Sequence, residues 1–355
     1  MSVTLATSAL VLAFFAFLAV PLIPACSELI RKTDHAPLNV VQQYAGDIRF
    51  FADGFRHYLA SIQPSLEDAA LSGSDATIVM PDGIPCVVLA PDAASHDLGI
   101  DSGICARTIV SLGDLALPAA TSFVRDIYAR RNLEGGAGDQ YRAVLGEGDV
   151  HLALNSIVMR WVHAVGAIDC APHCRLYGRV SSDRSILLRP GCNFTRLNAP
   201  RIATGDHGDG GSAESDGDTT STTANGITER VLHEGDFRIA PREVFVKHLV
   251  VRGELHIGAG ARILGNIKAQ KTVILEPEVI AQGSLISSSG LKIGPNCRLR
   301  GPVIAEHAIF IGEGAQIGSP KAPTTVSAPR IEIAENVVVF GTIWAREQGQ
   351  VVESK

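Results

Sequence analysis

Histidine is the residue of this sequence best suited to acid–base chemistry, because its ordinary pKa lies closest to neutral pH. A catalytic histidine also needs a neighbouring group to orient it or to exchange a proton with it. The sequence places no obvious partner beside any of the candidates, which are His151, His163, His173, His248, His256 and His307. The repeat described below points all of them outward on scattered coils, so the sequence predicts no enzymatic activity.

Cysteine and histidine also occur together at a spacing that could bind a metal. Cys170, His173 and Cys174 lie within one short stretch. The repeat points both cysteines inward, like Cys192 and Cys297, and points His173 away from them. Inward cysteines act as small core residues, so we expect neither a metal nor a cofactor. Cys174 and Cys192 stand one coil apart, within reach of a disulfide, but would stay reduced in a cytoplasmic protein.

These orientations follow from a repeat of 18 residues, which dominates the chain. Apolar residues recur in pairs two apart, and three such pairs, six apart, fill each repeat. A pair two apart is one β-strand that points two side chains to the same side, so three pairs form three faces. The sequence therefore predicts an all-β fold, a single-stranded parallel β-helix with triangular coils. Its core is expected to include Leu255, Ile257, Ile263, Ile267, Val273, Leu275, Leu291, Ile293, Leu299, Ile309 and Ile311.

The repeat also predicts where coils begin and where they turn. Coils are predicted to start at residues 115, 150, 168, 186, 237, 255, 273, 291, 309 and 331. Residues 115 and 150 are 35 apart, so 17 residues are interpreted as a surface excursion around 134–138. Glycines mark one corner of the coil, where a side chain would hinder the turn. These corner residues are Gly178, Gly265, Gly283, Gly301 and Gly341.

The β-helix is predicted in two parts, 115–202 and 234–346, followed by a tail at 347–355. Between the two parts, residues 203–233 form an acidic loop rich in Gly, Ser and Thr. Such a composition has little to bury and is expected to be disordered. We expect its deletion to change stability little, because loop length alters closure entropy slowly. Residues 72–114 do not fit the repeat and are expected to form an irregular β cap.

The N-terminal end predicts a membrane anchor. Residues 4–26 are an uncharged run of about 20 residues, the length that crosses a bilayer. Arg31 and Lys32 follow directly, which by the positive-inside rule puts the C-terminal domain in the cytoplasm. We therefore expect a single-pass inner-membrane protein. The net charge of −6 argues against nucleic-acid binding.

A short amphipathic helix is predicted next, over residues 38–62, with Pro64 ending it. Apolar residues recur there at steps of three and four. Two interpretations remain open. The apolar stripe could pack on the following domain, or Arg49 and Arg56 could hold the helix on the anionic inner leaflet.

Several segments resemble the bactofilins, bacterial cytoskeletal proteins that form polymers. The resemblance is carried by GNIKA at 265–269, GPVIA at 301–305 and GTIWA at 341–345, with LHIGAGA at 255–261. It covers about 237–345 well and 115–200 more weakly. It implies a right-handed β-helix, end-to-end polymerisation, no cofactor and no enzymatic activity. The membrane helix, about 90 residues before the first coil, and the long loop depart from the bactofilin pattern.

The predicted function is a membrane-anchored, bactofilin-like scaffold. It would self-associate and organise partner proteins at the cytoplasmic face of the inner membrane. The last coil, around Val339 and Ile343, is expected to make the end-to-end contact, because an end coil exposes an edge that another strand can extend. Its expected partners are itself, membrane lipid through the N-terminal helix, and unidentified proteins, but no nucleic acid.

The alternative function is that of a hexapeptide-repeat acyltransferase, a left-handed β-helix whose coils also have 18 residues. IGAGAR at 257–262 and IGEGAQ at 311–316 fit that hexapeptide. Other repeats do not, because small residues stand where a large aliphatic one is expected. These are Ala269, Ala281, Ser287 and Ala305.

Overall fold

The computed structural model describes residue 14 and residues 48–91, 97–205, 227 and 229–353. Residues Ile48–Lys355 form one compact unit. The predicted membrane segment 4–26, apart from Phe14, and the first part of the predicted amphipathic helix lie outside the described residues. Within the described part, no helix is both long enough and apolar enough to cross a bilayer.

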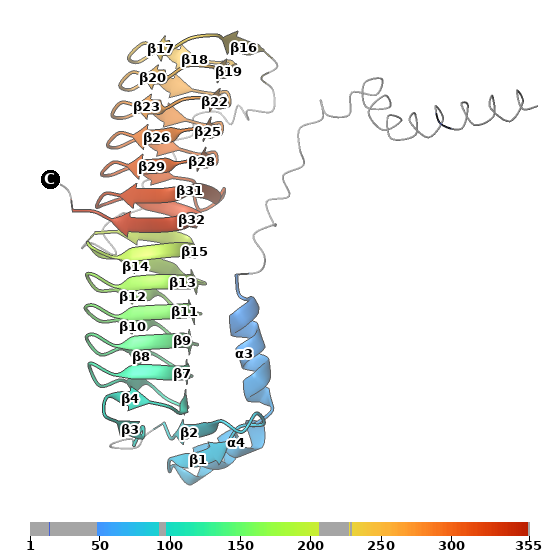
Figure 1. Cartoon of the computed structure of the whole chain (residues 1–355), viewed down its shortest axis with the longest axis vertical. Coiled ribbons are helices and arrows are strands. Elements are labelled where there is room, and N and C mark those ends of the chain that lie inside the picture. The colour runs from blue at the N-terminus through green and yellow to red at the C-terminus, as the bar shows by residue number, and fades with distance from the viewer. Residues whose placement is uncertain (1–13, 15–47, 92–96, 206–226, 228, 354–355) are drawn as a thin grey trace, which may run out of the picture. The chain divides into compact units, whose positions relative to one another are not determined.

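The unit is a β-solenoid of parallel coils, which confirms the predicted β-helix (Figure 1). In its second part, each strand pairs in parallel with the strand 18 residues further on, as Leu255 does with Val273 and Val273 with Leu291. The first face contains β17 (Phe237–Ile239), β20 (Leu255–Ile257), β23 (Val273–Leu275), β26 (Gly290–Ile293) and β29 (Ala308–Ile311). The second contains β18 (Val244–Phe245), β21 (Arg262–Ile263), β24 (Ile280–Ala281), β27 (Arg298–Leu299) and β30 (Gln316–Ile317). The third contains β16 (Arg230–His233), β19 (His248–Val251), β22 (Ile267–Ala269), β25 (Leu285–Ser287) and β28 (Val303–Ala305). Two longer strands, β31 (Thr324–Ile333) and β32 (Val338–Val351), bend round a corner and complete this part.

The first part of the solenoid is built in the same way. One ladder contains β2 (Pro85–Leu89), β5 (Thr108–Ser111), β7 (Ser122–Ala129), β9 (Gln140–Gly146), β11 (Ile157–Ala164), β13 (Arg175–Ser182) and β15 (Asn193–Thr204). Another contains β6 (Leu115–Ala116), β8 (Leu133–Glu134), β10 (Val150–Leu152), β12 (Ile168–Cys170) and β14 (Ser185–Leu188). β4 (Ile104–Cys105) pairs with the start of β7.

Side chains from all three faces fill the inside of the coils. The eleven core residues named from the repeat are each at most 2% exposed, among them Ile257, Ile293 and Ile311 at 0%. Full burial of a large aliphatic side chain contributes about 1.5–3 kcal/mol, so this stacked interior is the main source of stability.

The surface excursion expected around 134–138 is a prediction that the structure shows to be wrong. Residues 133–146 form one more coil, in which Leu133 pairs with Leu115 on one side and Val150 on the other. The sequence hid this coil because Gly135 and Asp139 stand where the repeat has apolar residues. One residue is also missing, so Val150 follows Leu133 by 17 residues rather than 18.

Asp139 replaces the expected apolar side chain without leaving an unpaired charge. It is 0% exposed and accepts hydrogen bonds from Thr121 N at 3.0 Å, Gly136 N at 2.8 Å and the Tyr141 hydroxyl at 2.7 Å. The Tyr141 ring stacks on Phe123 with centroids 5.6 Å apart. Burial raises the pKa of Asp139, and these three donors partly offset that effect.

Residues 72–114 are only partly the irregular cap that the sequence predicted. β2 and β5 already belong to the solenoid, since Cys86 pairs with Thr108 in parallel register. Two antiparallel pairings close this end: β1 (Ala76–Val79) pairs with β2, and β3 (Ile100–Asp101) pairs with β4.

Two helices precede the solenoid, where one was predicted. α3 spans Phe50–Ala60 and α4 spans Gln63–Ser72. Pro64 stands in the first turn of α4, where a missing N–H costs nothing, so it begins the second helix instead of ending the helical region. α4 contacts β2 at the closed end of the solenoid and buries Leu66 and Ala69.

α3 packs along the side of the solenoid, as one of the two interpretations of the amphipathic helix expected. It buries Ala52, Phe55 and Leu59. The Phe55 ring meets the edge of Trp161 with centroids 6.0 Å apart. Arg56 donates two hydrogen bonds to Glu147, at 2.8 and 3.1 Å.

The two parts of the solenoid run in opposite directions and meet at their C-terminal coils (Figure 1). The sequence predicted that coils 186 and 237 would follow one another across the loop. Instead, β15 pairs antiparallel with β32, the last strand of the chain. β16 and β17 lie at the far end of the second part, so the chain from Gly205 must lead back along that part before it coils again.

Candidate functional site

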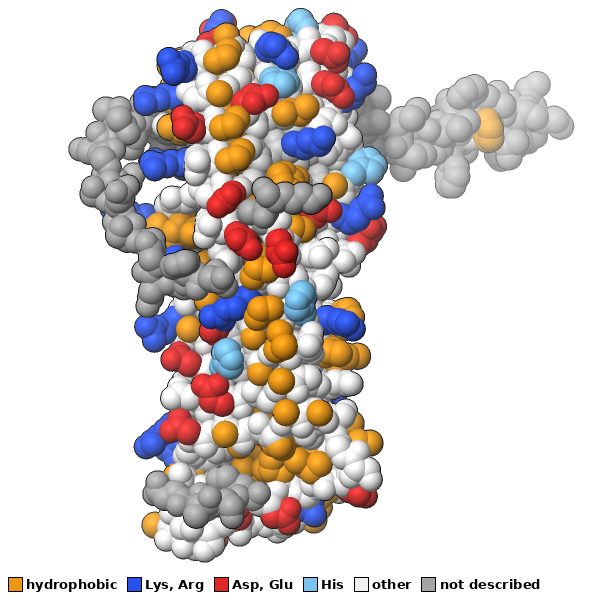
Figure 2. Space-filling view, turned by 90° about the vertical axis from the view of Figure 1, so that its left-hand side faces the viewer, with side chains coloured by type: hydrophobic (Ala, Val, Ile, Leu, Met, Phe, Trp, Pro, Cys, Tyr) orange, Lys and Arg blue, Asp and Glu red, His pale blue; other side chains and the backbone are white. Residues whose placement is uncertain are grey.

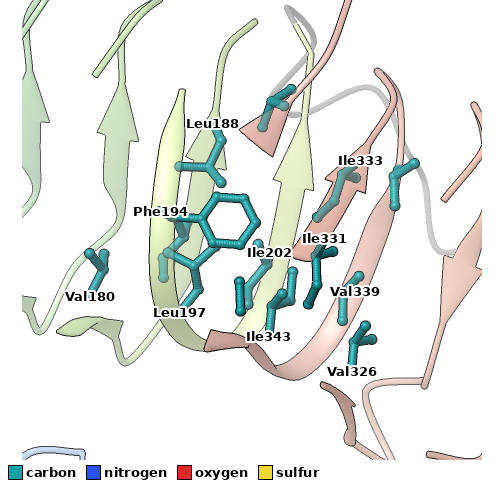
Figure 3. Close-up of a cluster of buried hydrophobic side chains, with 14 of the residues drawn as sticks. Val180, Leu188, Phe194, Leu197, Ile202, Val326, Ile331, Ile333, Val339 and Ile343 are labelled. Carbon is teal, nitrogen blue, oxygen red and sulfur yellow. The ribbon is translucent and has the colours of Figure 1, made fainter. Parts of the chain in front are cut away.

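The ends of the coils are the surfaces on which the predicted function depends. Where the two parts meet, Leu197 lies opposite Ile343 and Ile202 opposite Val339 in the antiparallel ladder. Figure 3 shows these four side chains packed together with Phe194, so that the two interiors form one continuous core.

Polar groups also join the two parts. Asn198 Nδ2 donates to Thr342 Oγ1 at 2.8 Å, and Thr204 Oγ1 donates to Ala334 O at 2.7 Å. The guanidinium of Arg196 lies over the Trp344 ring, 5.4 Å from its centroid. Such paired hydrogen bonds give the contact a defined register in addition to its apolar burial.

This junction corrects the expected role of Val339 and Ile343. The sequence predicted that they would meet another subunit, because they belong to the last coil. They are 1% and 0% exposed, covered by β15 of the same chain. The reason is that the second part of the solenoid runs back toward the first, which the repeat alone does not reveal. The end-to-end contact therefore occurs within one chain.

The opposite end of the second part is the open one. β16, β17 and β18 each pair on one side only, with β19, β20 and β21, among the described residues. Phe237 and Phe245 reach the core there but remain partly exposed, with ring centroids 6.3 Å apart. An unpaired strand edge over half-covered aromatic rings is a surface that another strand can extend.

Residues around this open end carry both hydrophobic groups and charges of both signs. Leu232, Val244 and Val246 are between 49% and 56% exposed. The charged residues of the same coil are Glu229, Arg230, Glu234, Asp236, Arg238, Arg242, Glu243 and Lys247. Because both signs are present on one small surface, it can be complementary to itself.

The closed end of the first part differs. There the antiparallel strand β1 covers β2, and α4 packs beside it. In the part of the chain that the structure describes, the solenoid thus has one covered end, one internal junction and one open end.

Three of the candidate histidines have partners that the sequence did not indicate. His163 Nδ1 lies 2.8 Å from Ser181 Oγ, His256 Nε2 lies 2.8 Å from Glu276 Oε1, and His151 Nδ1 lies 3.5 Å from Asp169 Oδ2. Each partner stands about one coil further along the chain. Pairing between residues about 18 apart was the signal that could have found them.

The His163–Ser181 pair has the geometry of a nucleophile and its base, but both side chains are buried. His163 is 1% exposed and Ser181 3%, so a substrate has no access to them. The repeat expected His163 to point outward into solvent, whereas it lies in the packed region beside α3. Burial lowers the pKa of His163, which keeps it neutral.

The cysteines are buried and unbridged, including Cys174 and Cys192 on neighbouring coils. Burial raises the pKa of Cys86 to about 12 and that of Cys297 to about 11. Such thiols stay protonated at neutral pH and are poor nucleophiles and metal ligands.

The corner glycines lie where neighbouring coils touch. A Cβ on Gly178 would stand 1.6 Å from Arg160 O, and one on Gly265 would stand 2.1 Å from Lys247 O. At Gly283, Gly301 and Gly341 the corresponding distances to the neighbouring coil are 2.3 to 2.4 Å. No other residue type fits there without displacing the adjacent coil.

Comparisons of the chain with protein-family models, with curated proteins and with solved structures find no match.

Proposed function

We propose that this protein is a structural scaffold that associates with a second copy of itself through the open coil end formed by β16, β17 and β18. The observation that carries the proposal is the unpaired edge of this coil, with Phe237 and Phe245 half covered beneath it. The junction within the chain supports it, because it is an example of two coil ends of this sequence pairing antiparallel.

The proposed assembly is a closed pair. A two-ended solenoid can add copies at both ends and grow into a filament, as the resemblance to bactofilins implies. Here the last coil is occupied within the chain and the first is covered by β1 and α4. One open end that meets its own equivalent gives a two-fold dimer and then stops.

We further propose that the scaffold is anchored to the inner membrane through residues 4–26, with the solenoid in the cytoplasm. The uncharged run and the flanking Arg31 and Lys32 support this orientation. A periplasm-dependent reporter enzyme fused after Lys355 is expected to remain inactive. An active fusion would overturn the orientation while leaving the pairing proposal untouched.

An acyltransferase remains the second candidate because of one observation. The imidazole of His256 is held by Glu276 at 2.8 Å on a half-exposed surface, the arrangement of a histidine oriented as a general base. Acetyl-coenzyme A hydrolysis or transfer that disappears in His256→Gln would establish this reading. Transfer that persists in that variant would remove its only support.

Electron microscopy of the full chain in detergent tests the scaffold proposal. We expect particles made of two solenoids joined end to end, twice the length of one. Single solenoids at all concentrations would contradict self-association. Long filaments would contradict the closed pair, since they need two open ends.

A further inference from the structure

A groove on the flank beside α3 has properties that the scaffold proposal does not use. It has a volume of about 510 Å³ and runs across consecutive strands β11, β13, β15 and β32, with Phe51 of α3 on one side. It therefore crosses both parts of the solenoid where they join, on the side of the solenoid that carries α3 (Figure 1).

Positive charge is concentrated in this groove. Its charged lining residues are Arg160, Arg179, Arg196 and Arg346, and its described lining includes no carboxylate. The flank turned away from α3 is different, because acidic and basic side chains are interspersed along it (Figure 2). A single-sign row of this kind raises the local concentration of oppositely charged groups.

Two of these arginines are placed against each other at a cost. Arg179 and Arg196 are direct register partners on adjacent strands. Burial, together with the charge of Arg179, lowers the pKa of Arg196, and Arg196 Nε is buried without a hydrogen-bond partner. Neighbouring like charges and an unpaired donor both destabilise the unoccupied groove, and a bound carboxylate would relieve both.

Aromatic rings hold the guanidinium groups in place. Arg179 lies 5.0 Å from the centroid of Phe51, and Arg196 lies 5.4 Å from that of Trp344. Around them Met159, Tyr177 and Trp344 are between 44% and 55% exposed. Large aromatic residues, Met and Arg are the types enriched at the centres of protein interfaces.

We infer that this groove binds an extended, acidic peptide segment of a partner protein. The groove is concave and its arginines are half-buried on its floor, a shape that admits a chain more readily than a flat bilayer surface. Adjacent coils are about 4.8 Å apart, so four strands span about 14 Å, the length of about four extended residues. Carboxylates on one side of such a segment would reach the arginines, while its apolar side chains would contact Tyr177 and Trp344. The inference concerns the flank and does not depend on pairing at the open end.

The chain itself provides the probe for a test. It contains two tryptophans, Trp161 and Trp344, and both line the groove. A peptide of alternating Glu and Leu, without aromatic residues, is titrated into the full chain in detergent while tryptophan fluorescence is followed. We expect a saturable change that weakens as salt rises from about 0.1 M to about 0.5 M, because the contacts are charged. A peptide of alternating Gln and Leu is expected to produce no saturable change.

The variants decide whether the groove is the site. Arg179→Gln combined with Arg196→Gln is expected to weaken binding by about tenfold or more. Arg175→Gln changes an exposed arginine of the same strand outside the groove and should bind as the unmodified chain does. Arg346→Gln, exposed at the rim, provides a second variant if the double change disturbs folding by circular dichroism. The inference is wrong if the Glu-Leu peptide does not bind, if these variants bind it unchanged, or if phosphatidylglycerol vesicles displace it through the same arginines more effectively than the free peptide does.

Discussion

Ile343, on the last strand of the chain, lies directly opposite Leu197, on the last strand of the first solenoid part, in an antiparallel register. Both side chains are 0% exposed. This single contact establishes that the two parts of the solenoid run toward each other, and it leaves the coil at residues 230–246 as the open end.

Truncation of Ile343 should loosen the junction. Ile343→Ala removes buried methyl groups and leaves a cavity between the two parts, which costs about 2–5 kcal/mol. Chemical denaturation followed by circular dichroism should show that loss. Glu347→Ala, at an exposed position of the same strand, should leave stability within about 0.5 kcal/mol. Equal small effects in both variants would mean that the junction contributes little.

The segment between Gly205 and Ile227 should be required for its length. It joins the junction to the far end of the second part, which lies about 30 Å away at about 4.8 Å per coil. Deletion of residues 206–226 leaves too few residues to span that distance, since an extended residue covers at most about 3.6 Å. This reverses the expectation, based on loop entropy alone, that the deletion changes little.

We therefore expect the deletion to separate the two parts or to force the second part onto another chain. Size-exclusion chromatography and limited proteolysis would detect either result. A Gly/Ser linker of the original length is the matched control, and it should restore the compact unit. A deletion variant that behaves like the unmodified chain would refute the reversed order of the two parts.

The sequence predicted the repeat well because each coil repeats the same physical requirement. Leu255, Val273 and Leu291 must all fill the same interior, and glycines such as Gly265 must all let one coil touch the next, so their spacing is visible in the chain. The coil at 133–146 was hidden because Asp139 and Tyr141 fill its interior by a hydrogen-bond network that no hydrophobic pattern records.

The junction could not be predicted for a different reason. Leu197 and Ile343 are inward residues in either direction of stacking, so the periodicity is the same whether the two parts continue or reverse. Nor could the sequence indicate which histidines have partners, because His163 meets Ser181 only when successive coils are placed in register.

The Asp139 network should be sensitive to loss of its charge geometry. Asp139→Asn replaces an acceptor by a donor that faces Gly136 N or the Tyr141 hydroxyl, so at least one buried donor loses its partner. We expect a loss of about 1–3 kcal/mol in the free energy of unfolding. Asp149→Asn, at an exposed carboxylate of the following turn, is the control and should have a much smaller effect. A neutral result at Asp139 would mean that its hydrogen bonds do not hold the coil.

His163 should make the fold sensitive to acid. Burial lowers its pKa below the ordinary value near 6.5. As the pH falls through that ordinary value, the unfolded chain takes up the proton before the folded protein does, so the stability falls with pH. The charged groups that influence it are Asp183, Arg56, Arg49 and Glu147.

The measurement is denaturant unfolding at about pH 8 and about pH 5.5. His163→Asn should reduce the difference in stability between the two pH values, whereas His173→Asn, at an exposed site, should leave it unchanged. An undiminished pH dependence in His163→Asn would assign the acid sensitivity to other groups.

Sedimentation velocity of the full chain in detergent, with and without a charge at the open end, tests the scaffold proposal most directly. We expect the unmodified chain to sediment as a concentration-dependent pair. Phe245→Lys, which places a cation among the half-covered rings of the end coil, should sediment as a single copy while its circular dichroism is unchanged. Ile304→Lys, at an exposed position on the flank of a middle coil, should still form the pair. Loss of the pair in Ile304→Lys and its persistence in Phe245→Lys, or a single copy for the unmodified chain at every concentration, would contradict the account.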